Sequence, residues 1–266
     1  MVEQLTARHL RKEYRLRGGE TLVAVHDVSF SVSAGDSLAI VGESGSGKTT
    51  CARIVAGLEP ATSGTVLFDE QEVDAAQARV SARRWRARQV QMVFQDPYSS
   101  LDPRQSVNDS VSEVLAAHGL HDRRERAART ADLLDKVGLP ERVGRSKPKQ
   151  LSGGQRQRVA IMKALAVKPR LLILDEAVSA LDVSVQAQVI NLLSDLRASE
   201  KLAFLFISHD LGVVRQVSDR VMVMRHGRVV EEGSTDAVLD APSDPYTQRL
   251  LDAIPRPGWK PVARAV

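Results

Sequence analysis

The chain has 266 residues, 26% of them charged, and a net charge of +4, which suits a globular domain with a substantial core. Its single cysteine, Cys51, excludes an internal disulfide or a cysteine metal cluster and indicates a reducing compartment. Aromatic residues make up only 4%, which argues against nucleic-acid binding. No apolar run approaches the roughly 18 residues of a membrane span, and we expect no signal peptide. Any contact with a membrane would then be made through partner proteins.

Apolar stretches in the first part of the chain predict strands that lead into a glycine-rich turn. They cover residues 21–25, 28–32 and 37–41, and the last is apolar on both faces, as a central parallel strand requires. Two more such runs lie at 171–174 and 203–207. Between them, apolar residues recur at helical spacing from Val185 to Leu196. The alternation of strands and helices predicts an α/β fold with a parallel sheet covered by helices.

The middle and the end of the chain have different patterns. Residues 96–168 lack a strong strand signal and are rich in Ala, Arg, Leu and Glu, which predicts a mostly helical subdomain. Near the end, 221–224 and 229–230 flank His226-Gly227, which predicts a hairpin with these two residues in its turn. From Ala241 onward the chain is proline-rich, and we expect it to be irregular.

A glycine-rich segment follows the strand at 37–41 and precedes a helical stretch. Its sequence, GESGSGKTT, matches the phosphate-binding pattern G-x-x-x-x-G-K-[ST]. Glycines allow backbone N–H groups to converge on phosphate oxygens, and the helix adds its positive end. A glycine turn that binds nothing is the less favoured alternative. We expect Lys48 to bridge the β- and γ-phosphates, Thr49 to ligate Mg²⁺, and the run as a whole to hold the phosphates, namely Gly42, Glu43, Ser44, Gly45, Ser46, Gly47, Lys48, Thr49 and Thr50.

Charged and polar side chains follow two further predicted strands. Asp175 and Glu176 end the run at 171–174, and His209 follows the run at 203–207. In α/β proteins ligands gather at such strand ends, so we expect Asp175 to be a partner of Mg²⁺, Glu176 a general base for the attacking water, and His209 a contact to the γ-phosphate. Alone, the acidic pair would mark a solvated strand end and the histidine a structural residue. The phosphate-binding pattern upstream favours the functional interpretation.

Residues 151–155 have the sequence LSGGQ, a turn of small residues that opens a predicted helix over 155–166. The backbone N–H groups and the Ser152 hydroxyl of such a turn can hold a phosphate. Together with the phosphate loop, the acidic pair and His209, in this order, the pentapeptide resembles the ABC ATPase nucleotide-binding domain over essentially the whole chain. The resemblance implies a P-loop NTPase core with a mixed, largely parallel sheet, an antiparallel β subdomain and a helical signature subdomain.

The resemblance also implies a domain organisation and a shared nucleotide site. The ATPase domain would cover 1–240, with the helical subdomain at about 96–168 inserted, and 241–266 would be a C-terminal extension. Two subunits would pack head to tail and hold ATP between Lys48 of one and the LSGGQ turn of the other, with contacts from Ser152, Gly153, Gly154 and Gln155. Three further matches are Gln95, which would sense Mg²⁺ and the attacking water, Asp182, in a loop between the two sites, and Tyr14, which would stack on adenine.

Three longer stretches are more specific. Residues 95–104, 180–188 and 244–247 resemble the oligopeptide and dipeptide branch of ABC importers, which includes nickel and glutathione importers. This implies a second ATP-binding subunit, identical or not, two membrane permeases, an extracytoplasmic solute-binding protein, and a place at the cytoplasmic face of the inner membrane. Two departures are Ala177, where a proline is usual, and residues 147–150, which replace an aromatic-Pro-His-Glu sequence.

Other functions and features carry less weight. An accessory ATPase of a soluble assembly, such as a carbon-phosphorus lyase system, would have a closely similar sequence, and partner identity would distinguish it. A DNA-repair ATPase would need long coiled coils, and the chain has no heptad array. The arginines of residues 79–88 and 123–129 could bind anionic partners, but we interpret them as solvated helix faces.

Overall fold

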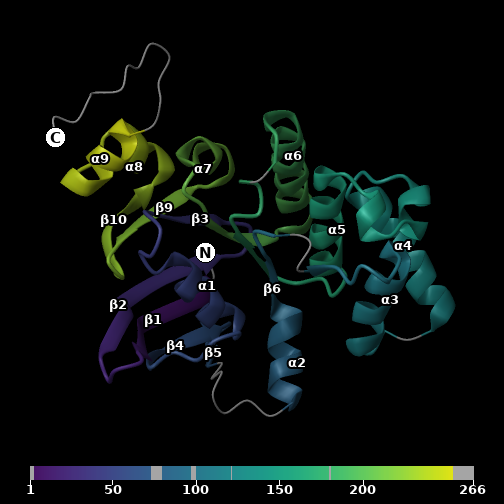
Figure 1. Cartoon of the computed structure of the whole chain (residues 1–266), viewed down its shortest axis with the longest axis horizontal. Helices are drawn as coiled ribbons and strands as arrows, with labels where there is room; N and C mark the ends of the chain where they lie inside the picture. The colour runs from purple at the N-terminus through teal and green to yellow at the C-terminus, as the bar shows by residue number, and fades with distance from the viewer. Residues whose placement is uncertain (1–2, 73–79, 97–99, 121, 180, 254–266) are drawn as a thin grey trace.

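A six-stranded sheet forms the centre of the protein in the computed structural model, which describes residues 3–72, 80–96, 100–120, 122–179 and 181–253 (Figure 1). Its strand order is β10-β9-β3-β8-β7-β6, and all neighbours are parallel except β10, which is antiparallel to β9. The strands are β3 (Ser37–Val41), β6 (Val90–Val93), β7 (Leu171–Asp175), β8 (Ala203–Ile207), β9 (Arg220–Arg225) and β10 (Arg228–Ser234). Every residue of β3, β7 and β8 is buried, which explains why only Ser37 and Asp175, at the ends of β3 and β7, are polar in these strands.

A second, antiparallel sheet has the order β2-β1-β4-β5. It contains β1 (Glu3–Arg15), β2 (Thr21–Ser33), β4 (Ser63–Phe68) and β5 (Gln71–Glu72). The expectation of two short strands at 21–25 and 28–32 is wrong, because both belong to β2, which continues through Asp27 although that residue has a φ of 54°. The strand β1 was not predicted, because charged and polar residues at its exposed positions interrupt the apolar pattern. The predicted antiparallel β subdomain is confirmed.

Helices cover both sheets, and α3, α4 and α5 gather on one side of the molecule (Figure 1). The helices are α1 (Lys48–Ala56), α2 (Val80–Gln89), α3 (Val107–Ala117), α4 (Arg123–Lys136), α5 (Gly153–Leu165), α6 (Val183–Glu200), α7 (Leu211–Val217), α8 (Thr235–Asp240) and α9 (Pro245–Asp252). Short 3-10 turns at Glu141–Arg145 and Pro148–Gln150 join α4 to α5. Within the described residues, no helix combines the length and the apolar character needed to cross a membrane.

Two predictions about the C-terminal part have different outcomes. The hairpin is confirmed, since β9 and β10 flank His226 and Gly227, both at positive φ. The expectation of an irregular chain from Ala241 is wrong for Pro245–Asp252, which form α9 with Asp244 as the N-cap. Proline is favoured in the first turn of a helix, so Pro245 begins α9 instead of preventing it. Residues 254–266 lie outside the described chain.

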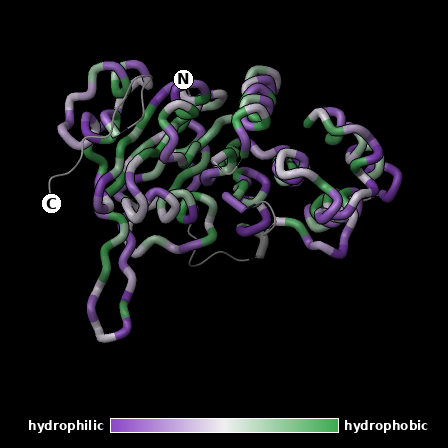
Figure 2. The backbone as a smooth tube through the Cα atoms, turned by 45° about the horizontal axis from the view of Figure 1, so that its top comes forward, coloured by the Kyte–Doolittle hydropathy of each residue, from purple (hydrophilic) through white to green (hydrophobic). Residues whose placement is uncertain are grey.

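The central sheet separates two apolar cores. One contains α1 and the antiparallel sheet, and the other contains α3, α5, α6 and α7. Hydrophobic residues are concentrated along the central strands in Figure 2. The carboxyl ends of β3, β6, β7 and β8 are therefore held by packing on both faces, and the polar residues that follow these strands have fixed positions.

Candidate functional site

The phosphate loop leaves β3 and is enclosed by the β9–β10 hairpin. A Cβ atom at Gly42 would lie 2.1 Å from the carbonyl oxygen of Met224, and one at Gly47 would lie 2.5 Å from that of Ala24. Both glycines have positive φ, 144° and 101°. The N–H of Gly227 donates to the carbonyl of Ser46 across 3.0 Å. Only glycine fits at these two positions, and backbone contacts on two sides hold the loop in shape.

The loop leads directly into α1, whose N-terminus is open to an anion. The N-cap is Gly47, and no side chain accepts a hydrogen bond from the first turn. The first N–H groups of a helix have no partner within the helix, and the helix dipole places positive charge there. This end of α1 is thus suited to bind phosphate oxygens.

Lys48 is buried, with 6% of its surface exposed, and its ammonium lies inside the loop. Its Nζ donates to the carbonyl oxygens of Gly42 and Glu43, each at 2.8 Å. Burial lowers the pKa of Lys48, while the negative charges of Glu176, Asp175 and Glu43 act in the opposite direction. The lysine is therefore a desolvated cation near three carboxylates, which is the environment expected for a group that binds an anionic ligand.

Thr49 and Asp175 join the loop to the end of β7. The Thr49 hydroxyl donates to Oδ1 of Asp175 across 3.0 Å. Burial raises the pKa of Asp175, and the hydrogen bond from Thr49 opposes this effect. These oxygens are hard donors of the kind that Mg²⁺ prefers. The described residues contain no cluster of three or more His, Cys, Asp or Glu side chains that could hold a metal ion without further ligands. The pair fits a Mg²⁺ ion that takes its other ligands from phosphate and water.

Glu176 lies between two of the other predicted site residues. Nε2 of Gln95, just beyond β6, donates to Oε2 of Glu176 across 2.9 Å. Nδ1 of His209, just beyond β8, is 3.3 Å from Oε1. The side chain of Glu176 is 21% exposed and that of His209 is 59% exposed. A carboxylate held in this way can accept a proton from a water molecule that approaches from the solvent side.

The backbone of Glu176 is also held in an unusual conformation. Its φ is 49°, a left-handed value that is rare for residues other than glycine and costs on the order of 1–3 kcal/mol. Its N–H donates to Ile207, and its carbonyl accepts from both the N–H and the hydroxyl of Ser179. These bonds fix the direction in which the carboxylate leaves the strand end. Strained residues that are held by their surroundings cluster at functional sites.

Tyr14, at the end of β1, lies near α1. The pKa of Tyr14 is raised, mainly by burial and by Glu59, while Thr50 acts in the opposite direction. The influence of Thr50 places the Tyr14 hydroxyl close to the second threonine of the phosphate loop. The ammonium of Lys12 lies 5.0 Å from the centre of its ring. The structure thus brings Tyr14 to the loop, together with Lys48, Thr49, Thr50, Asp175, Glu176, Gln95 and His209.

The LSGGQ turn occupies a different place, at the start of α5 (Figure 1). The helix begins at Gly153, two residues earlier than predicted, because Ser152 and Gln155 form a capping box with distances of 3.0 and 3.3 Å. A Cβ atom at Gly154 would lie 2.3 Å from Cγ1 of Val185 in α6. The turn is thus packed tightly against α6 and belongs to the helical side of the molecule.

Asp182 caps the start of α6. Its carboxylate accepts from the N–H of Val185 across 3.0 Å and from the hydroxyl of Ser184. These bonds lower its pKa. Val183, the next residue, is 81% exposed. Ala180 and residues 97–99, parts of the stretches compared with the importer branch, lie outside the described residues.

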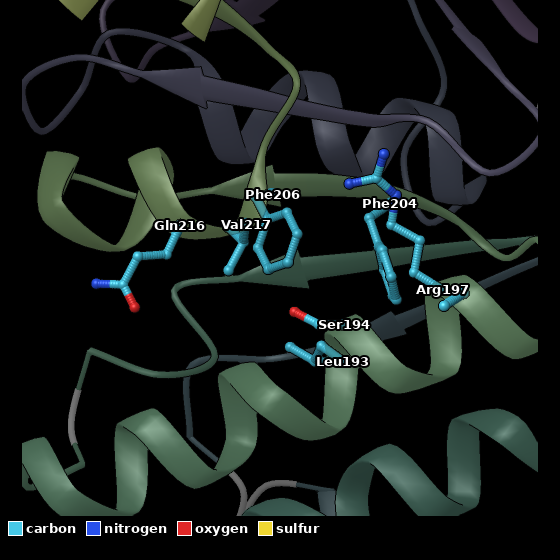
Figure 3. A pocket seen from close by; sticks show the side chains of 8 residues that line it. Leu193, Ser194, Arg197, Phe204, Phe206, Gln216 and Val217 are labelled. Carbon is cyan, nitrogen blue, oxygen red and sulfur yellow. The ribbon is translucent and has the colours of Figure 1, made fainter. Parts of the chain in front are cut away.

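A separate pocket of about 260 Å³ lies between α6 and α7 (Figure 3). Phe204 and Phe206 of β8 face it, and the rest of its wall comes from α6 and α7, namely Leu193, Ser194, Arg197, Ala198, Gln216 and Val217. The pocket lies against the apolar core that contains α3, α5, α6 and α7, and none of the predicted site residues lines it.

Contacts that the sequence did not reveal also shape the site. Met224, Ala24 and Gly227 enclose the phosphate loop mainly through backbone atoms, although the terminal methyl group of Met224 also lies near Gly47. Backbone contacts do not depend on side-chain identity. The one usable signal was the His226-Gly227 pair, which predicted the turn but not its contact with Ser46.

Comparisons with known proteins show the family and the fold. A family model described as ABC transporter matches residues 25–179, more than half of the chain. The chain is 47% identical over 259 residues to proteins named glutathione import ATP-binding protein GsiA from Escherichia coli (strain K12) and Shigella flexneri. The match covers 94% of this chain but only 41% of each of these relatives.

Solved structures with the same fold are cassettes of transport proteins. A dimeric post-hydrolysis state of the ATP-binding cassette MJ0796 with ADP and Pi has a TM-score of 0.78 and 29% identity, and covers 87% of this chain and 98% of its own. CbiO1 from Clostridium perfringens, part of an ABC transporter complex, has a TM-score of 0.79 and 28% identity, and covers 91% of this chain and 92% of its own.

Proposed function

The chain belongs to the ABC transporter family, and from this membership we propose that it is the ATP-binding and ATP-hydrolysing subunit of an importer. The observation that carries the proposal is the convergence of Lys48, Asp175 and Glu176 beside the open N-terminus of α1. A cation, an oxygen donor for a metal and a candidate base meet where phosphate oxygens would bind. This is the combination that nucleotide hydrolysis requires.

Each residue has one task in this proposal. The loop amides and Lys48 bind the β- and γ-phosphates, and the ring of Tyr14 stacks on the base. Thr49, Asp175 and Gln95 would hold Mg²⁺, and the ion would supply positive charge to the phosphate oxygens. Glu176 accepts a proton from the attacking water, and His209 contacts the γ-phosphate and the Glu176 carboxylate.

We also propose that two subunits bind head to tail around ATP. Ser152, Gly153, Gly154 and Gln155 of one subunit would contact the triphosphate held by Lys48 of the other, with Asp182 beside the interface. ATP binding would close the pair, and hydrolysis would release it.

Within the family we propose the peptide and glutathione branch, because the 47% identity to glutathione import proteins extends over 94% of the chain. The partners would be two permeases and an extracytoplasmic solute-binding protein, with this subunit at the cytoplasmic face of the inner membrane. Residues 241–266 would be the extension of that branch, and residues 1–240 the ATPase domain with 96–168 as its helical insertion.

Purification of the native complex tests the proposal. We expect the chain to co-purify with two polytopic membrane proteins and to hydrolyse ATP only when Mg²⁺ is added. Peptides, nickel chelates and glutathione can then be compared as stimulators of the ATPase in the presence of the binding protein. Co-purification with soluble lyase subunits, without permeases, would contradict the importer assignment and support a soluble accessory ATPase.

A further inference from the structure

The C-terminal helix α9 makes a direct contact with the phosphate loop. Tyr246, in its first turn, is 4% exposed, and its hydroxyl oxygen accepts a hydrogen bond from the backbone N–H of Glu43 across 3.0 Å. Glu43 is the second residue of the loop and lies 203 positions earlier in the chain. An element at the other end of the sequence thus contacts the candidate ATP site.

The hydrogen bond joins the same peptide unit that positions Lys48. The N–H of Glu43 and the carbonyl of Gly42 belong to one planar trans peptide and point in opposite directions. The N–H donates to Tyr246, and the carbonyl accepts from Nζ of Lys48 at 2.8 Å. A rotation of this peptide would break both bonds together. The Tyr246 hydroxyl therefore fixes the orientation of the carbonyl that receives the lysine.

Tyr246 is itself firmly held. The guanidinium of Arg225, at the end of β9, lies 4.9 Å from the centre of its ring. Oδ1 of Asp244 accepts from the N–H of Tyr246 across 2.6 Å and caps the helix. The ring and the backbone are thus fixed independently of each other.

Glu231 of β10 anchors the start of α9. Its carboxylate accepts from the N–H and hydroxyl of Ser243 at 2.7 and 2.8 Å and from the N–H of Asp244 at 3.2 Å. Burial tends to raise the pKa of Glu231, but the nearby Thr247 side chain and the hydrogen bonds from Ser243 and Asp244 outweigh it and leave the pKa lowered. A chain of contacts therefore runs from β10 through α9 to the phosphate loop.

We propose that Tyr246 is a positioning residue for nucleotide binding and that α9 sets the affinity of the phosphate loop for ATP. The proposal rests on the proposed function, since it assumes that the loop binds the triphosphate. Tyr246 acts through the Gly42–Glu43 peptide without touching the nucleotide. A loop held in its binding shape loses less conformational freedom when ATP binds, so the loss of this bond weakens affinity.

The test uses the full chain and the variant Tyr246→Phe, which removes one oxygen atom and keeps the ring that packs against Arg225. We expect the Kd for Mg-ATP, measured by calorimetry, and the KM for ATP to rise about 3- to 10-fold, the effect of one lost hydrogen bond. The kcat should stay within about twofold of wild type, because a change in nucleotide binding alone leaves the chemical step intact. Glu231→Gln should change KM in the same direction by a smaller factor.

A second variant separates positioning from stability. Leu251→Val, in the same helix, loosens the packing of a residue that is 8% exposed and leaves the Tyr246 hydroxyl in place. We expect it to lower Tm while KM stays within about twofold of wild type. Wild-type Kd and KM in Tyr246→Phe, or a rise in KM that Leu251→Val reproduces, would overturn the inference. If the wild-type chain itself bound no Mg-ATP, the proposed function would fail instead.

Discussion

Nδ1 of His209 lies 3.3 Å from Oε1 of Glu176, so two side chains from the ends of neighbouring parallel strands meet at one carboxylate. Gln95, from the end of a third strand, binds the other oxygen of the same group. The three residues Gln95, Glu176 and His209 lie just beyond the ends of adjacent strands, so the central sheet determines where they meet. This arrangement makes Glu176 the clearest target for mutation.

We expect Glu176→Gln to retain ATP binding and lose turnover by about 10²- to 10⁴-fold, because the base is removed while the phosphate loop remains intact. Single-turnover hydrolysis and ATP affinity, measured on the same preparation, test this. The hydrolysis-deficient variant should also accumulate as an ATP-bound dimer in size-exclusion chromatography. Hydrolysis near the wild-type rate would refute the role of Glu176 as base.

Lys48→Ala should abolish measurable ATP affinity, because it removes the one buried cation within the loop and leaves the negative charges of Glu176, Asp175 and Glu43 uncompensated. Lys149→Ala, at an exposed position in a 3-10 turn, is the matched control and should bind ATP like the wild type. Titration calorimetry with Mg-ATP gives the measurement. Unchanged affinity in Lys48→Ala would contradict the proposed phosphate site.

The sequence predicted the core of the site because its signals are local. Strands β3, β7 and β8 are buried along their whole length and appear as apolar runs, and each is followed directly by its polar site residues. The strand β1 was missed because it carries charged and polar residues at its exposed positions. The helix α9 was missed because Pro245 was interpreted as a sign of irregular structure, although it follows the capping residue Asp244.

The contact between Tyr246 and Glu43 had no sequence signal of its own. The two residues are 203 positions apart, and one of the groups involved is a backbone N–H, which every residue except proline possesses. Tertiary structure alone brings them together. The motif at 244–247 indicated a relationship between proteins, and its physical role became visible only in the folded chain.

Gly153 and Gly154 should respond differently to substitution by alanine. A Cβ atom at Gly154 would lie 2.3 Å from Val185, so Gly154→Ala should lower the free energy of unfolding by about 1–3 kcal/mol. At Gly153 the nearest atom, in Leu181, is 4.0 Å away, so Gly153→Ala should be neutral or slightly stabilising. Chemical denaturation measures both values.

Dimerisation gives the second readout for these two glycines. Tested in combination with Glu176→Gln, both substitutions should prevent the ATP-dependent dimer. The methyl group of Gly153→Ala would lie on the exposed side of the turn, where the partner's triphosphate is proposed to bind, whereas that of Gly154→Ala would push the turn away from α6. Since Gly153→Ala fits within the monomer, its loss of dimerisation would report on the partner alone. A normal ATP-dependent dimer in Gly153→Ala would argue against close contact between this turn and a partner's nucleotide.

Cys51 should make the stability of the protein depend on pH under alkaline conditions. Burial raises the pKa of its thiol from 9.0 to about 12, so the folded protein excludes the thiolate that forms in the unfolded chain above pH 9. Burial of the neutral thiol therefore contributes its full stabilisation of the folded state below pH 9, and this contribution is lost as the pH rises toward 12. The free energy of unfolding should fall by up to about 1.4 kcal/mol per pH unit in this window because of Cys51.

The variant Cys51→Ala isolates this contribution, because lysine and tyrosine side chains ionise in the same pH range in both proteins. Urea denaturation at pH 8, 9 and 10 should show a steeper decline in stability for the wild type than for the variant. The folded wild type should also resist a thiol reagent at pH 8 and react once it is unfolded, since the thiolate is the reactive form. Parallel declines in the two proteins would mean that the thiol ionises as easily in the folded chain as in the unfolded one. The complete burial of Cys51 on the core-facing side of α1 makes such ionisation physically costly.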